Sequence, residues 1–363
     1  MGAACDRTHG NRYSTYNTAV GPGLPRGRCA AARDCNDMNG NSIRWRPGRR
    51  GHYEGWFVAF NNPAEKAGYW IRYSLLAPSD AGRQPLAQVW FMRTDRARTP
   101  RNRALRTTYP IHQLVTTEKP FGVEVAGSRL ADGGCGGTLA DASGSVSWNL
   151  QFESLIEGFT SIPEWGARIA TCFLEPKPLL RVTGEISESG ATRHVNGWLG
   201  EQAHVFGARH SDRWHWAECK HLGEGRAFTG VAGWPRFPPR TITSLALRGG
   251  GISMTRTGLT DLLRAVTKHS PDGWVFDAEY ATERLAGRVS PQRDDLIGIT
   301  YHDPSGRPVY CYHSELADIS LRYYRRDSGR SAWKLAEQMV AEDSAAFEYG
   351  STTRLGGIPM LID

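Results

Sequence analysis

The chain has 363 residues, of which 40% are hydrophobic and 22% are charged, and this composition excludes fibrous and mostly disordered proteins. At this length we expect two domains of ordinary size, each with its own core. The net charge of +7 would suit a nucleic-acid partner, but the arginines are scattered over loop-like stretches, so we expect no nucleic acid to bind.

The seven cysteines lack CxxC spacing, which argues against a disulfide framework or a zinc knuckle and favours reduced thiols in a cytoplasm. The sequence has no apolar run long enough to cross a membrane, and its first residues lack the order of a signal peptide. We therefore expect a soluble cytoplasmic monomer or homodimer without stable membrane insertion.

Residues 1–42 are rich in Gly, Asn, Arg, Ala and Pro, which predicts a disordered or loosely packed N-terminal arm. From Ile43 onward, short alternating or apolar runs are separated by turn residues, a pattern typical of a sandwich or barrel. These runs predict a first β domain over 43–223. Its strands are predicted at 52–60, 69–76, 88–93, 121–125, 146–152, 179–186, 201–206 and 214–219.

A second β domain is expected over 224–363. Its strands are predicted at 241–247, 274–280, 295–301, 307–313 and 317–324. Apolar residues at helical spacing predict two helices, the second of them C-terminal, between Ser331 and Gly350. The two stripes are Leu259, Leu262, Leu263 and Val266, and then Trp333, Ala336 and Val340. The architecture is thus predicted to be all-β, with two barrels or sandwiches and few peripheral helices.

The densest motif covers residues 196–219. Side chains alternate between the two faces of a strand, so residues two apart point the same way. The resulting sets are Gln202, His204 and Phe206 in one strand and Trp214 and Trp216 in the next. A barrel interior with such indoles beside an amide and an imidazole would bind a flat or polyene ligand. The alternative is that Gln202 and His204 form structural hydrogen bonds and that the tryptophans are core residues.

The histidines between 204 and 221 lack HxH or HExxH spacing, so no metal is expected. The sequence contains no GxSxG elbow and no P-loop, which disfavours nucleotide and dinucleotide enzymes. We expect no cofactor.

The first strand pair contains a carboxylate and a guanidinium on faces that also carry tryptophans, Glu54 with Trp56 and Arg72 with Trp70. A carboxylate among apolar neighbours has a raised pKa unless it is paired, which would make Glu54 a general acid. The alternative is an ion pair between Glu54 and Arg72 without a catalytic role. The substrate-binding residues we expect are Tyr53, Trp56, Trp70, Arg72, Trp90, Phe206, Trp214 and Trp216.

Several segments also carry a resemblance to known proteins. They are His52-Tyr-Glu-Gly-Trp-Phe57, Gly68-Tyr-Trp-Ile-Arg-Tyr73, Gly197-Trp198, Trp214-His-Trp216, Tyr301-His-Asp-Pro and Tyr310-Cys-Tyr-His-Ser-Glu315. Over about 43–324 the chain thereby resembles the carotenoid 1,2-hydratase, AttH-like and tocopherol-cyclase-like group of double lipocalin-like proteins. The resemblance implies two lipocalin-like barrels and cofactor-free hydration or cyclisation of terpenoid or polyketide-like alkenes.

The resemblance also implies an acid on the strand after the Gly-aromatic pair, where this chain has Gly200. Its neighbour Glu201 should face the other side of the sheet, unless a bulge shifts the register. This departure favours a cyclisation or isomerisation that is guided by shape and a few hydrogen bonds. If acid chemistry persists, Glu54 is the expected donor, and the two indoles would stabilise a carbocation. The catalytic residues we expect are Glu54, Gln202 and His204.

The expected function is that of a cofactor-independent enzyme of natural-product metabolism that binds a hydrophobic, alkene-containing small molecule. Its site is expected in the first domain or at the seam between the halves. The alternatives are a non-catalytic carrier that uses the same cavity and an interaction protein that uses the basic arm. A titratable group inside the pocket would separate the enzyme from the carrier.

Overall fold

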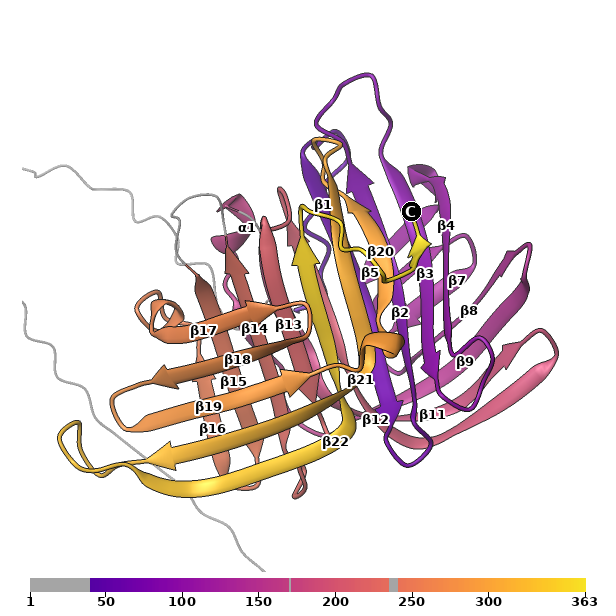
Figure 1. Cartoon of the computed structure of the whole chain (residues 1–363). Helices are drawn as coiled ribbons and strands as arrows, with labels where there is room; N and C mark the ends of the chain where they lie inside the picture. The colour runs from indigo at the N-terminus through magenta and orange to yellow at the C-terminus, as the bar shows by residue number, and fades with distance from the viewer. Residues whose placement is uncertain (1–39, 170, 235–240) are drawn as a thin grey trace, which may run out of the picture. The chain divides into compact units, whose positions relative to one another are not determined.

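The computed structural model of the chain describes residues 40–169, 171–234 and 241–363, so most of the predicted arm over 1–42 lies outside the described residues. Within these ranges the strands form two sheets, of 12 and 11 strands (Figure 1). The prediction of an all-β protein with two sets of strands is confirmed.

The first sheet is antiparallel and follows the order β4-β3-β2-β1-β12-β11-β9-β8-β7-β6-β5, with β10 paired to β11. Its strands are β1 (His52–Asn62), β2 (Ala67–Ala77), β3 (Leu86–Asp95), β4 (Asn102–Pro110), β5 (Leu114–Glu118), β6 (Phe121–Val125), β7 (Ser128–Ala131), β8 (Gly134–Asp141), β9 (Gly144–Ser154), β10 (Phe159–Ile162), β11 (Thr171–Glu188) and β12 (Ala191–Gly207).

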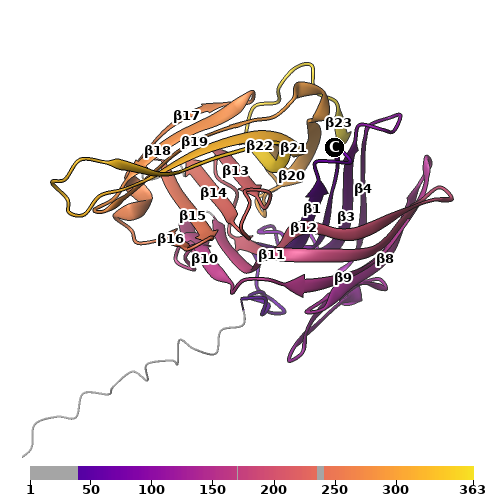
Figure 2. The same cartoon turned by 90° about the horizontal axis from the view of Figure 1, so that it is seen from below.

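This sheet curls into a nearly closed barrel, in which β4 comes back against β8 (Figure 2). Alternation along β1 sends Trp56, Val58 and Phe60 into the barrel core. The opposite face of β1 carries Tyr53 and Phe57, which belong to a different core.

The second sheet follows the order β16-β15-β14-β13-β22-β21-β19-β18-β17, with β20 between β21 and β23. Its strands are β13 (Arg213–Cys219), β14 (Ala227–Trp234), β15 (Ile242–Gly249), β16 (Ile252–Arg256), β17 (Ala265–Ser270), β18 (Gly273–Glu279), β19 (Glu283–Ser290), β20 (Ile297–His302), β21 (Pro308–Arg325), β22 (Lys334–Ser351) and β23 (Met360–Ile362). The described residues also contain short helices, α1 (Gly166–Ile169), η1 (Ile111–Gln113), η2 (Asp261–Leu263) and η3 (Arg293–Asp295).

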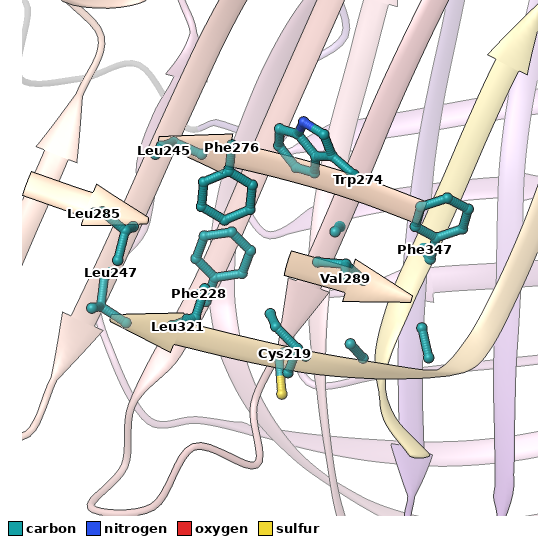
Figure 3. Packing of buried hydrophobic residues seen from close by; sticks show 14 of the residues in the cluster. Cys219, Phe228, Leu245, Leu247, Trp274, Phe276, Leu285, Val289, Leu321 and Phe347 are labelled. Atoms are coloured by element: carbon teal, nitrogen blue, oxygen red, sulfur yellow. The ribbon is translucent and has the colours of Figure 1, made fainter. Parts of the chain in front are cut away.

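The second sheet forms a half-barrel with its own core, in which Phe276 stacks on Phe228 and packs at a tilt against Trp274 (Figure 3). A third core lies between the two sheets and combines residues of both, such as Trp70 and Trp216. Hydrogen bonds also cross this seam, because the Asn61 side-chain amide donates to the Glu315 carbonyl at 2.7 Å. The sheets therefore pack against each other through the outer face of the first barrel.

The two predicted helices are wrong. The segment 259–266 contains only the short η2 and the start of β17, and residues 334–351 form the strand β22. Leu262 is the single buried member of the first stripe, whereas Leu259 and Val266 are 64% and 72% exposed. In β22, Met339 is buried and Val340 is exposed, so the segment follows the two-residue period of a strand.

The change from one sheet to the other falls between Gly207 and Arg213. Strand β13, which we expected to close the first domain, pairs with β14 and β22 of the second sheet. The division of the chain into domains at residue 223 stays a prediction. Among the described residues, we find no helix of the length and apolar character that crossing a membrane requires.

Candidate functional site

The predicted catalytic residues lie inside the first barrel. In the pairing of β1 with β12, Glu54 lies opposite Phe206 and Trp56 lies opposite His204. The rings of Trp56 and His204 stack with centroids 4.8 Å apart. The prediction that Gln202, His204 and Phe206 share one face is confirmed by this register.

The Glu54 carboxylate is fully buried and accepts four hydrogen bonds. They come from the backbone N–H groups of Arg44 and Trp45, each at 2.7 Å, from His52 Nε2 at 3.0 Å and from His204 Nε2 at 2.9 Å. Burial raises the pKa of Glu54, but the hydrogen bonds from His204 and His52 outweigh burial and lower the pKa to about 2. The carboxylate is thus paired, which is the exception that the sequence argument allowed, and its low pKa argues against Glu54 as a general acid near neutral pH.

The other polar side chains of this face hold the chain segment that enters the barrel. His204 Nδ1 bonds the Gly40 carbonyl at 2.7 Å, and Gln202 Nε2 donates to Asn41 Oδ1 at 3.1 Å. Trp56 Nε1 donates to the Asn41 carbonyl at 2.9 Å. Asn41 is 2% exposed, so residues 40–42 belong to the folded part and not to a loose arm. These contacts are the structural hydrogen bonds of the alternative interpretation.

Arg72 is not the partner of Glu54. The pairing of β1 with β2 places Arg72 opposite Phe57 and Glu54 opposite Leu75, so the two charged groups lie on opposite faces of the sheet. The expected ion pair is therefore absent from the described residues, and Arg72 faces the seam between the sheets.

At this seam lies a cavity of about 950 Å³, a volume that includes its open mouth. Its walls are mainly aromatic and come from both sheets. Of the predicted substrate-binding residues, those that line it are Tyr53, Trp70, Arg72, Trp214 and Trp216. Trp90 lines a neighbouring pocket, while Trp56 and Phe206 face the first barrel.

Strand β22 places a carboxylate on the wall of this cavity. Glu348 Oε1 accepts a hydrogen bond from His313 Nδ1, and Oε2 accepts one from Trp214 Nε1, both at 3.1 Å. Its side chain is 13% exposed. Burial raises the pKa of Glu348, but His313 and Trp214 outweigh burial and hold the pKa below its usual value. Glu348 is therefore a charged proton acceptor in an apolar pocket.

His313 lies behind Glu348 and is fully buried between Trp70 and Trp216. Its Nε2 bonds Glu315 Oε1 at 2.7 Å. Burial lowers the pKa of His313, but hydrogen bonds to Glu315 and Glu348 raise it to about 9. Near neutral pH the ring is thus an imidazolium between two carboxyl groups. This Glu348-His313-Glu315 chain links the cavity wall to the buried seam.

Arg72 and an aromatic stack form another part of the cavity wall. Arg72 Nη1 donates to the Tyr301 hydroxyl at 3.5 Å, and its guanidinium lies 5.2 Å from the Tyr301 ring centroid. Gly55 makes room for this cation, because a Cβ at Gly55 would lie 2.6 Å from Arg72 Nε. The His210 ring stacks between Tyr53 and Tyr301, at centroid distances of 4.3 and 5.1 Å.

Sequence reasoning missed Glu348, His313 and Tyr301 as site residues. The motifs at 301–304 and 310–315 entered only as marks of resemblance, and Glu348 fell in the predicted C-terminal helix. The alternation of Phe347 and Tyr349 with Ala346 and Glu348 was the signal that could have revealed a strand there.

The histidines between 204 and 221 lie in different parts of the structure. His204 faces the first core, His210 lines the cavity, and His215 stacks on Trp274 in the second core. Within the part of the chain that the structure describes, no group of three or more His, Cys, Asp or Glu side chains is arranged to hold a metal ion.

No protein family model matches the chain. Two curated relatives, Uncharacterized protein MT0513 and Uncharacterized protein Rv0493c from two strains of Mycobacterium tuberculosis, are each 24% identical over 314 residues. Each alignment covers 80% of this chain and 87% of the relative.

Solved structures share the arrangement of the two sheets. The Nitrosomonas europaea protein NE1406, described as an AttH, aligns over 83% of this chain and 92% of its own, with 12% identity and a TM-score of 0.54. CghA, crystallised with Sch210972, aligns over 84% of this chain and 89% of its own, with 10% identity and a TM-score of 0.52. Kievitone hydratase from Nectria haematococca aligns over 82% of this chain and 88% of its own, with 10% identity and a TM-score of 0.47. The first two show the fold, and the chain is thus an all-β protein with a two-part lipocalin-like fold.

Proposed function

We propose that the protein is a cofactor-independent enzyme that binds a hydrophobic, alkene-containing small molecule between the two sheets and moves a proton on it. The reaction class is isomerisation, cyclisation or hydration. The observation that carries the proposal is Glu348, an ionised carboxylate on the wall of an aromatic cavity, hydrogen-bonded to His313 and Trp214.

The chemistry follows from the charges around the cavity. A buried carboxylate with fixed hydrogen bonds serves as a general base when a substrate C–H or O–H lies within hydrogen-bond reach. When Glu348 takes the proton of a C–H beside a carbonyl, the electron pair moves to the carbonyl oxygen. Arg72 and Tyr301 supply donors for that oxyanion. Return of the proton from Glu348 to another carbon completes an isomerisation. Alternatively, attack of the carbanion on a conjugated alkene closes a ring, and the proton held by Glu348 then returns to the new carbanion and regenerates the carboxylate.

The aromatic walls have a second role, because they hold a flexible apolar substrate in one reactive conformer. Trp214 is fixed by its hydrogen bond to Glu348, so the base and part of the wall are positioned together. The proposed proton transfer occurs at the seam and not at the predicted residues Glu54, Gln202 and His204. CghA shares this fold and was crystallised with Sch210972, which supports a ligand-binding role for the two-sheet architecture.

The rival function is a carrier that releases its ligand unchanged, and solvent deuterium separates the two. The purified protein is incubated in D2O with metabolites that organic solvent extracts from cells that lack it, amphiphilic acids included, and the compounds are followed by mass spectrometry. The wild-type protein should give a product that contains deuterium, and Glu348→Gln should reduce its rate by about 100-fold or more.

The matched control is Glu342→Gln, which changes an exposed glutamate of the same strand and should keep the wild-type rate. A co-purified compound that the wild-type protein returns with unchanged mass and no deuterium would contradict the enzyme and favour the carrier.

A further inference from the structure

A second pocket lies next to the aromatic cavity. The two share Tyr53, Arg72, His210 and Tyr301, so these four side chains border both spaces. The walls of the first are mainly aromatic and aliphatic, whereas the second adds the basic side chains of Arg83, Arg106 and His302. One continuous site thus has an apolar part and a cationic part.

The charge of Asp363 partly offsets burial in the pKa of Arg106, and Arg72 helps to lower the pKa of Glu348, so the cationic part is incompletely neutralised. Among the described residues, none of Arg72, Arg83 and Arg106 has an ion pair within 4.0 Å. Arg106 donates to the backbone oxygens of Thr300 and of Asp363, the last residue of the chain, and its guanidinium lies 5.0 Å from the Trp90 ring centroid. The nearby carboxylates are occupied elsewhere. The Asp303 carboxylate bonds His210 and Arg307, and the side-chain carboxylate of Asp363 bonds Thr300 and Arg354.

Arg72 is the most informative member of this group. It is 7% exposed, and its Nε has no hydrogen-bond partner. Removing a guanidinium from water without a counterion is costly, and a bound anion would repay this cost. Burial is the largest cause that lowers the pKa of His302. The charges of Arg106 and Arg83 lower it further, by more than Asp363 and Asp303 raise it, so the net charge felt by His302 is positive.

We propose that the substrate is an anionic amphiphile, whose apolar body fills the aromatic cavity and whose carboxylate or phosphate head group binds Arg72, Arg83 and Arg106. The inference rests on the proposed function, since it names the substrate class of the same site. Guanidinium groups bind both head groups through paired N–H donors, and exclusion of water by the aromatic walls strengthens that contact.

The test measures binding of four probes with the same twelve-carbon chain to the full chain by isothermal titration calorimetry. The probes are dodecanoate, dodecyl phosphate, dodecanol and dodecyltrimethylammonium, all below their micelle concentrations. At least one anion should bind about 10-fold or more tightly than dodecanol, which corresponds to one charge-assisted contact. Comparison of dodecanoate with dodecyl phosphate tells which head group the pocket prefers.

Arg83→Gln and Arg106→Gln should each reduce the preference for the anion over dodecanol by several-fold and leave the affinity for dodecanol unchanged. Arg83 is exposed, so its substitution keeps the test valid if Arg106→Gln fails to fold. Arg181→Gln is the control, because Arg181 is exposed and pairs with Glu153 outside the pocket.

Equal affinity for dodecanol and both anions, or preferred binding of the ammonium probe, would overturn the proposal. The proposal would also be overturned if Arg83→Gln and Arg106→Gln weakened the binding of dodecanol as much as they weakened the binding of the anions. The measurement requires no turnover, so its failure leaves proton transfer at Glu348 untouched, and failure of the deuterium experiment leaves the head-group preference untouched.

Discussion

Glu54 is a buried anion whose stabilising effect depends on pH. Its pKa is lowered from 4.5 to about 2, so the carboxylate stabilises the folded state above pH 4.5, and this stabilisation is lost as the pH falls towards 2. Glu54→Gln removes the charge that accepts four hydrogen bonds and should lower the free energy of unfolding at pH 7 by about 3 kcal/mol. Urea unfolding of the variant and the wild type at several pH values measures the difference.

The difference should shrink as the pH falls from 4.5 towards 2, because the wild-type carboxylate then takes up a proton. Glu342→Gln, at an exposed position, should unfold like the wild type throughout. Equal stability of Glu54→Gln and the wild type at pH 7 would refute a structural role for this carboxylate.

The sequence identified Glu54 and Arg72 as unusual residues but not their surroundings. The hairpin pairs Asn62 with Ala67, and this loop length decides that Arg72 lies opposite Phe57 and not beside Glu54. One residue more or fewer in the loop would turn every side chain of β2 to the other face of the sheet. A sequence pattern does not predict loop length to within one residue. The donors from residues 44 and 45 come from outside the strands and carry no periodic signal.

At the scale of elements, the contact between β13 and β22 positions the cavity wall. Trp214 lies opposite Gly350 in the register, and a Cβ at Gly350 would lie 2.0 Å from the indole. Gly350→Ala should therefore displace Trp214 from Glu348, weaken dodecanol binding about tenfold and destabilise the fold by about 1–3 kcal/mol. Titration calorimetry and urea unfolding measure the two effects.

Gly356→Ala is the matched control, since nothing lies within 4 Å of a Cβ at that position. If Gly350→Ala bound dodecanol with wild-type affinity, the indole of Trp214 would not be a necessary part of the cavity wall.

Strands were easier to predict than helices in this chain. The run 121–125 coincides with β6, because alternation and flanking turns mark a strand locally. The helix predicted from Trp333, Ala336 and Val340 is wrong because three apolar residues can fall at helical spacing by chance in or beside a long strand. Ala336 and Val340 are exposed, so they bury no helix face. Trp333 instead lies under the Arg326 guanidinium.

At the scale of the whole molecule, the seam between the sheets is both the third core and the candidate site. Its residues come from strands as distant in sequence as β1 and β22, and local patterns carry no information on such pairing. A buried network also crosses it, in which Lys220 Nζ bonds Glu201 Oε2 of β12 at 2.9 Å and also contacts Glu218 of β13. Glu201 faces away from the first core, as the sequence predicted from its neighbour Gly200.

Glu175 of β11 belongs to the same network and gives stability the opposite pH dependence from Glu54. Burial, and then the charge of Glu201, raises the pKa of Glu175 from 4.5 to about 8, while Thr229 Oγ1 donates to its Oε2 at 2.7 Å. The folded state thus favours the protonated acid, and stability from this group is complete below pH 4.5 and lost as the pH rises through 8, by at most about 1.4 kcal/mol per pH unit.

Glu175→Gln should flatten the fall in unfolding free energy between pH 5 and 8 and make the variant more stable than the wild type at pH 8. Urea unfolding at four pH values measures this slope, with Glu342→Gln expected to retain the wild-type slope. A Glu175→Gln slope as steep as that of the wild type would show that Glu175 is already ionised in the folded seam.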